Sequence, residues 1–116
     1  MNINGAHFLI YSNDADADRK FFREVLNFKS VDAGHGWLIF KLPPAEAAVH
    51  PADGATGAEL YLMCDDLQAT MEELAAKNVI CTEVATERWG LRTTVPLPSG
   101  GHIGLYQPTH PVALNL

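Results

Sequence analysis

The sequence predicts an α+β domain made of two similar modules, each with one strand, one helix and about three further strands. Two observations predict this fold. The apolar pattern of residues 6–28 recurs in residues 59–79, at an offset that aligns His7 with Glu59. Each copy is followed by a strand, a Pro-containing turn and another strand, at 37–51 and 93–108. We therefore expect a duplicated βαβββ unit.

The first module is expected to begin with a strand at 6–12, because apolar residues alternate there with a period of two. One face of this strand would carry His7, Leu9 and Tyr11, and the other would carry Phe8 and Ile10. A helix should follow, because Asn13, Asp14 or Asp16 can cap its first turn. Apolar residues then recur at helical spacing, at Ala17, Phe21, Phe22, Val25 and Phe28. Asn27 suits a left-handed helix stop.

The second module repeats this order. A strand is expected at 59–64, with Glu59, Tyr61 and Met63 on one face and Leu60, Leu62 and Cys64 on the other. Asp65 and Asp66 can cap the following helix, and Asn78 suits its end. The apolar stripe of this helix is Leu67, Met71, Leu74 and Ala75.

One such module cannot enclose a core, because its helix covers one face of the sheet and leaves the other bare. Two modules side by side would curl their sheets into one cupped mixed sheet. Glu59 would then point into the hollow together with His7, Tyr11 and Tyr61. A carboxylate facing the interior of a sheet is costly unless it is paired, metal-bound or wet. The sequence therefore predicts a groove beside Glu59.

Composition excludes several classes of function. The chain has 116 residues, enough for one domain, composed of module 1 (1–54) and module 2 (55–116). Its net charge is −6 and no cluster of Lys and Arg is present, which argues against nucleic acid as a partner. No apolar run approaches the roughly 18 residues of a membrane span. The first residues do not resemble a signal peptide, so we expect a cytoplasmic protein in which Cys64 and Cys81 are reduced thiols.

The modules resemble the vicinal oxygen chelate superfamily, which includes glyoxalase I, extradiol dioxygenases, fosfomycin resistance enzymes and bleomycin-binding proteins. The resemblance covers essentially the whole chain. Its carriers are "GAHFLIYSNDADADRKFFREVLNF", "ELYLMCDDLQATMEELAAKNV" and "RWGLRTTVPLPSGGHIGLYQP". It implies a homodimer in which modules of two subunits complete each cavity, with or without exchange of modules. His7 of one chain would then meet Glu59 of the other.

The resemblance also implies where a metal would bind. In metal-using members, the first and the last strand of each module each supply one ligand. These positions fall on His7, on Val49 or its neighbour His50, on Glu59 and on Gly104. The predicted ligands of a divalent ion (Fe, Mn, Ni, Zn or Co) are therefore His7, Glu59 and His50, with Glu59 as the catalytic carboxylate. Gly104 departs from the family pattern, which usually has a glutamate there.

Four further residues are predicted to contact the substrate: Tyr61, Trp89, His102 and Tyr106. Trp89 is explained equally well as a side chain that plugs the edge of the sheet. Glu59 has two simpler explanations, a strand end in water or a pair with His7. We interpret Trp37 as a core residue, and His35 and His110 as surface residues of loops.

Three functions follow from these observations. The first is a metal-dependent lyase or dioxygenase that acts on a substrate with two neighbouring oxygens. The second is a metal-free protein that binds and sequesters a ligand or antibiotic, as bleomycin-binding members do. Gly104 and the negative charge favour this second function modestly. The third is a protein that retains the scaffold for assembly and has lost the site.

Overall fold

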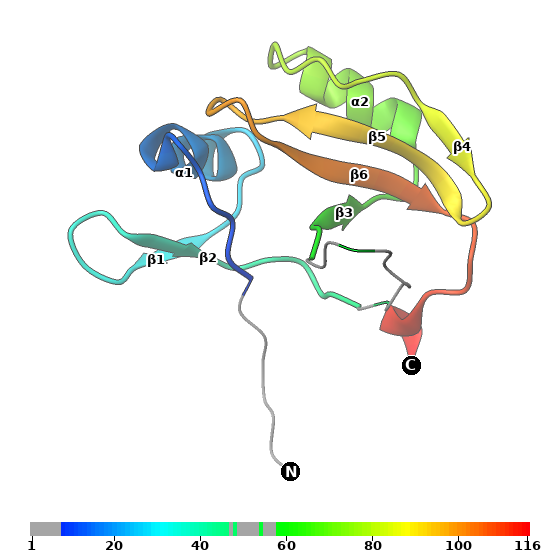
Figure 1. The fold of residues 1–116 in the computed structure, drawn as a ribbon, viewed down its shortest axis with the longest axis horizontal. Coiled ribbons are helices and arrows are strands. Elements are labelled where there is room, and N and C mark those ends of the chain that lie inside the picture. Colours follow the sequence, from blue (N-terminus) through cyan, green and yellow to red (C-terminus); the bar gives the residue numbers. More distant parts are fainter. Residues whose placement is uncertain (1–7, 47, 49–53, 55–57) are drawn as a thin grey trace.

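The structure is a computed structural model that describes residues 8–46, 48, 54 and 58–116. Its elements follow each other as helix, two strands, strand, helix and three strands, with a short 3₁₀ helix at the end (Figure 1). They are α1 (Ala15–Glu24), β1 (Ser30–Asp32), β2 (Leu38–Phe40), β3 (Tyr61–Met63), α2 (Leu67–Ala75), β4 (Ala85–Glu87), β5 (Gly90–Pro96), β6 (His102–Pro108) and η1 (Ala113–Asn115).

The second module forms as predicted. Its four strands make a mixed sheet in the order β3-β6-β5-β4, in which β3 runs parallel to β6 and the other neighbours are antiparallel. In this register Tyr61 lies opposite Gly104, and Arg92 lies opposite Tyr106. The sheet is curved, and α2 lies along one of its faces (Figure 1).

Both helices begin and end where the sequence predicts. The Asp14 carboxylate accepts a hydrogen bond from the Ala17 N–H of α1 at 3.1 Å. Asp66 accepts one from the Ala69 N–H of α2 at 3.0 Å. Asn27 and Asn78 have φ angles of 59° and 64°, the left-handed conformation that stops a helix.

The core lies between the helices and one face of the four-stranded sheet. Its buried members are Phe21, Phe22, Leu67, Leu74, Val79, Val95, Leu97, Ile103 and Leu105. The α1 helix reaches this core beside the β5–β6 turn (Figure 1). There the buried Asp18 carboxylate accepts hydrogen bonds from the Ser99 N–H at 3.1 Å and the Ser99 hydroxyl at 2.8 Å. These two bonds tie α1 to the second module.

The first module differs from the prediction. Residues 8–12 form no strand, and Phe8, Ile10 and Tyr11 are exposed, so the strand predicted at 6–12 is wrong for its described residues. An extended segment becomes a strand only when another strand pairs with it, and none lies beside 8–12 in the described part of the chain. The strands β1 and β2 form a separate two-stranded antiparallel sheet.

Trp37 is also not a core residue. Its side chain is 65% exposed, and the Arg19 guanidinium lies over its ring at 4.8 Å from the centroid. The sequence places an aromatic at the start of a strand but does not reveal that, among the described strands, β2 pairs with β1 alone. Among the described helices, none is both long enough and apolar enough to span a membrane.

Candidate functional site

The candidate site lies on the face of the four-stranded sheet that points away from both helices, which we call the open face. Successive residues of a strand point to opposite sides, and directly paired residues share a side. The residues that core packing leaves on the open face are therefore Tyr61 and Met63 of β3, Gly104 and Tyr106 of β6, Arg92 and Thr94 of β5, and Glu87 of β4.

Three aromatic rings pack together at one end of the open face. Tyr61, Trp89 and Tyr106, which we call the aromatic trio, have ring centroids 5.2–5.9 Å apart and interplanar angles of 80–87°. This edge-to-face arrangement is favourable because the positive edge of one ring meets the negative face of the next. The three rings form an apolar cluster that carries two hydroxyl groups, in which Tyr61 and Trp89 are partly exposed and Tyr106 is buried.

Trp89 reaches the trio from the turn between β4 and β5. Its carbonyl accepts a hydrogen bond from the Thr109 N–H at 3.0 Å, which fixes the turn against the end of β6. Gly90 follows, and a Cβ atom there would collide with the carbonyl oxygen of Gln107. The glycine therefore allows the close approach of strands that holds Trp89 beside Tyr106.

Tyr61 depends on a second glycine. Its ring lies directly on Gly104, and a Cβ atom built at position 104 would collide with the Cδ1, Cε1 and Cγ atoms of the ring. Any side chain at this position would have to displace Tyr61. The glycine and the tyrosine therefore form one unit, in which the ring occupies the space that a side chain of residue 104 would fill.

Charged groups surround the trio. Glu59 is exposed and lies two residues before Tyr61. Glu87 accepts a hydrogen bond from the Arg92 Nε–H at 3.1 Å. Burial raises the pKa of the Tyr61 hydroxyl, and the negative charge of Glu59 raises it further, while Arg92 lowers it. Tyr61 is therefore a neutral hydroxyl at physiological pH, able to donate a hydrogen bond.

His110 extends the trio, although the sequence analysis interpreted it as a surface residue. Its ring stacks on Tyr106 at a centroid distance of 6.0 Å, with Nε2 3.3 Å from the tyrosine hydroxyl. Its Nδ1 lies 2.7 Å from the Pro111 carbonyl, which only accepts, so Nδ1 carries a proton. In the neutral ring, Nε2 then accepts from Tyr106. The sequence does not predict this contact between Tyr106 and His110, because the contact depends on how the chain turns after Pro108.

Glu46 closes the same end of the face. Its carboxylate accepts a hydrogen bond from the Ala113 N–H at 2.6 Å, just beyond His110. The pKa of Tyr106 is raised by burial and, to a smaller extent, by the charge of Glu46. Glu46, which follows β2, and the residues after β6 therefore meet beside the trio.

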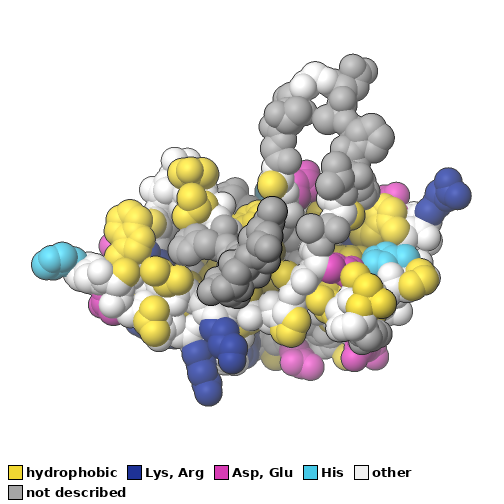
Figure 2. Space-filling view, turned by 90° about the horizontal axis from the view of Figure 1, so that it is seen from below, with side chains coloured by type: hydrophobic (Ala, Val, Ile, Leu, Met, Phe, Trp, Pro, Cys, Tyr) yellow, Lys and Arg dark blue, Asp and Glu magenta, His cyan; other side chains and the backbone are white. Residues whose placement is uncertain are grey.

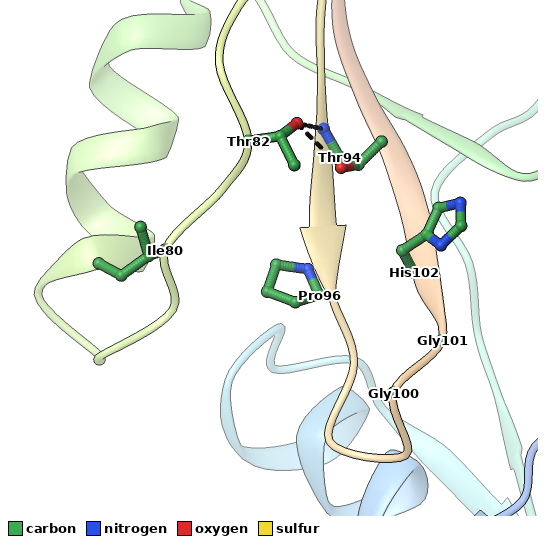
Figure 3. Close-up of a pocket in the computed structure, with 7 residues that line it drawn as sticks. All are labelled: Ile80, Thr82, Thr94, Pro96, Gly100, Gly101 and His102. Atoms are coloured by element: carbon green, nitrogen blue, oxygen red, sulfur yellow. Dashed lines mark hydrogen bonds between the residues drawn. The ribbon is translucent and has the colours of Figure 1, made fainter.

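The far end of the open face holds a shallow hollow of about 270 Å³ (Figure 3). It is lined by Ile80, Thr82, Thr94, Pro96, Gly100, Gly101 and His102. The Thr82 hydroxyl accepts a hydrogen bond from the Thr94 N–H at 2.9 Å. His102 is exposed and lies four residues before Tyr106 on β6, about 13 Å away along the strand.

The sequence matches no protein-family model and no curated protein, but solved structures share its fold. The antibiotic-binding protein TnmS3 from Streptomyces sp. CB03234 is 24% identical, with a TM-score of 0.69 over 94% of this chain and 99% of that chain. A lactoylglutathione lyase from Agrobacterium tumefaciens is 17% identical, with a TM-score of 0.66 over 92% and 95%. A glyoxalase/bleomycin resistance protein from Streptomyces sp. CB03234 is 20% identical, with a TM-score of 0.50 over 83% and 93%. The chain has the fold of the vicinal oxygen chelate superfamily.

The predicted superfamily fold is thus confirmed, and the described residues can be compared with the metal pattern of the vicinal oxygen chelate fold. The position that usually holds the last-strand glutamate is Gly104, and the Tyr61 ring fills the space above it. Of the predicted ligands, His7 and His50 lie outside the described residues, and Glu59 is exposed. Within the described ranges, no three His, Cys, Asp or Glu side chains gather in a way that could hold an ion. The described residues alone, without His7 and His50, do not fit a metal site.

The predicted contact residues fall into two groups. Tyr61, Trp89 and Tyr106 meet in the aromatic trio, with Glu59 beside them, and His102 lies apart in the hollow. Their role in binding stays a prediction. The alternation of side chains along β3 and β6 was enough to predict that Tyr61 and Tyr106 share a face of the sheet. This alternation is a property of each strand and needs no knowledge of its neighbours.

Proposed function

We propose that this protein binds a flat, apolar small molecule on the aromatic trio, without a metal. The observation that carries the proposal is the contact between Tyr61 and Gly104. It replaces the usual last-strand ligand with an aromatic ring that two other rings support. Aromatic side chains with polar tips are typical of ligand sites, where rings provide contact area and hydroxyls fix orientation.

The neighbouring structures support this class of function. TnmS3, which shares the fold over nearly the whole chain, is an antibiotic-binding protein. The glyoxalase/bleomycin resistance protein belongs to the same set of neighbours. The hollow at His102 lies on the same face as the trio, so a ligand longer than about 13 Å would extend from the rings to His102.

Thermal unfolding with naphthylmethanol, a neutral flat probe, tests the proposal. A ligand that binds only the native state raises the unfolding temperature, so wild-type protein should become more stable as the probe concentration rises. Trp89→Ala should abolish this shift. Val84→Ala, which shortens an exposed apolar side chain outside the trio and outside the first module, should retain it. If both variants respond like wild type, the trio is not the binding site.

A metal-dependent lyase or dioxygenase, with His7, Glu59 and His50 as ligands, is the outcome that would replace this proposal. Elemental analysis of protein purified without chelators distinguishes the two functions. A stoichiometric divalent metal that is lost in Glu59→Ala would establish the metal site and overturn the metal-free proposal.

We further propose that the protein is a homodimer. Apolar side chains are exposed at the end of the molecule that carries the first module (Figure 2). They include Phe8, Leu9, Ile10, Tyr11, Val31, Trp37 and Ile39. Exposed apolar groups collected in one region are typical of a protein interface. A second copy of the chain would cover them and, as the family resemblance implies, would supply its first module to the cavity.

A further inference from the structure

We propose that the aromatic trio selects aromatic cations, meaning flat apolar molecules that carry one amine or quaternary ammonium group. This inference rests on the proposed function and adds a charge to the ligand. It follows from the carboxylates that surround the trio and from the electron-rich rings of Tyr61 and Trp89, which are partly exposed, whereas Tyr106 is buried.

Carboxylates approach the trio from three separate parts of the chain. Glu59 lies two residues before Tyr61 and is exposed, so that its charge is available to a ligand. Glu46 is held near Tyr106 by its hydrogen bond to the Ala113 N–H, three residues after His110. Glu87 lies on the open face at the edge strand β4, hydrogen-bonded to Arg92.

The positive charges nearby are fewer or already paired. Arg92 is bound to Glu87 at 3.1 Å, so this pair contributes little net charge. Arg88 precedes Trp89 and is exposed, so it offsets part of the charge of the equally exposed Glu59. His110 donates from Nδ1 to Pro111 and, in its neutral form, accepts from Tyr106. Glu46, Glu59 and Glu87 thus stand against Arg88 and Arg92, and the net charge around the trio is negative and attracts a cation.

The rings themselves add to this preference. A cation over an aromatic face is attracted by the negative centre of the ring, most strongly over tryptophan. The tyrosine hydroxyls stay protonated, because burial and the nearby carboxylates raise the pKa values of Tyr61 and Tyr106. The rings thus remain neutral and accept a cation without becoming charged themselves.

Three naphthalene compounds with different charges test the inference on the full-length protein. Isothermal titration calorimetry would compare naphthylmethylamine, which is a cation at neutral pH, with neutral naphthylmethanol and anionic naphthoate. We expect the amine to bind about tenfold more tightly than the alcohol, and naphthoate to bind most weakly. The amine affinity should fall as salt is added, because screening weakens the attraction of the exposed Glu59.

Glu59→Gln should bring the ratio of amine to alcohol affinity toward one. Glu73→Gln, on α2 at the other side of the sheet, is the matched control and should keep the wild-type ratio. Equal affinities for the amine and the alcohol, or tighter binding of naphthoate, would overturn the charge preference and leave the proposed function intact. Failure of all three compounds to bind would overturn the proposed function itself.

Discussion

At the scale of single residues, the site depends on the pair of Tyr61 and Gly104. The ring lies where any side chain of residue 104 would have to go, so the two positions are coupled. The family resemblance explains why a ligand would be expected at this position. The structure explains why a glycine stands there instead, since a larger residue would remove one ring of the trio.

Gly104→Ala tests this coupling. The added methyl group would collide with the Tyr61 ring, and we expect the free energy of unfolding to fall by about 1–3 kcal/mol, as overpacking does. The variant should also lose the stabilisation by naphthylmethanol. Gly101→Ala is the control, because its Cβ would meet ordinary contacts at 3.5 and 3.8 Å. Equal stability of both variants, measured by chemical denaturation, would contradict the coupling.

A second prediction at this scale concerns alkaline pH. The pKa values of Tyr61 and Tyr106 are raised by burial above the ordinary value of 10.0. Above pH 10 the unfolded chain therefore loses these protons before the folded chain does. It follows that the free energy of unfolding decreases as pH rises through this range, and that the tyrosines contribute no such slope at lower pH.

The measurement is the free energy of unfolding at several pH values between about 9 and 11, around the tyrosine pKa. Other groups titrate in this range as well, so the comparison is with the double variant Tyr61→Phe and Tyr106→Phe. The wild type should show the steeper decrease. Identical slopes would show that the two hydroxyls have ordinary pKa values.

At the scale of elements, the sequence predicted most of the second module and less of the first. Helix caps, helix stops and the alternation of strands depend on neighbours in the chain, so Asp14, Asp66, Asn27 and Asn78 were placed correctly. Pairing between distant strands does not depend on chain neighbours. For that reason the alternation at 6–12 predicted a strand that residues 8–12 do not form.

Contacts between distant strands also limit how much of the candidate site the sequence predicts. The aromatic character of positions 61, 89 and 106 was visible in the sequence. The contact of Tyr61 with Gly104 was not visible in the sequence, because predicting it requires knowledge of the register between β3 and β6. His110 was missed because its contact with Tyr106 arises from the path of the chain after β6.

The contact of α1 with the β5–β6 turn is a polar contact that joins the two modules beside their shared apolar core. Ser99→Ala would remove the hydroxyl that donates to the buried Asp18 carboxylate. Loss of a hydrogen bond to a buried charged group costs about 1–3 kcal/mol. Ser30→Ala, at an exposed position of β1, should cost far less. Similar midpoints of chemical denaturation for the two variants would contradict the anchoring role of Asp18.

At the scale of the whole molecule, the two ends of the chain differ in how well they bury their apolar groups. The second module supplies most of the buried core and exposes Ile80, Val84, Leu114 and Leu116, whereas the first exposes a larger group of apolar side chains. A monomer would leave this surface in water. The proposed homodimer accounts for it, because a second copy would cover the region.

Light scattering after gel filtration checks the homodimer. We expect a mass of twice 12.6 kDa for the wild type. Ile10→Asp, which places a charge in the exposed apolar region, should shift the mass toward the monomer while circular dichroism stays unchanged. Ile80→Asp, at another exposed isoleucine in the second module, should remain a dimer. A wild-type mass of 12.6 kDa at all concentrations would contradict the proposal.

The aromatic trio is proposed to bind a flat ligand without a metal. Calorimetric titration of naphthylmethanol into chelator-treated protein, with its metal content checked by elemental analysis, measures this binding. We predict saturable binding, with the same affinity before and after chelation. Binding that appears only when a divalent metal is added back, or no binding at all, would contradict the proposal.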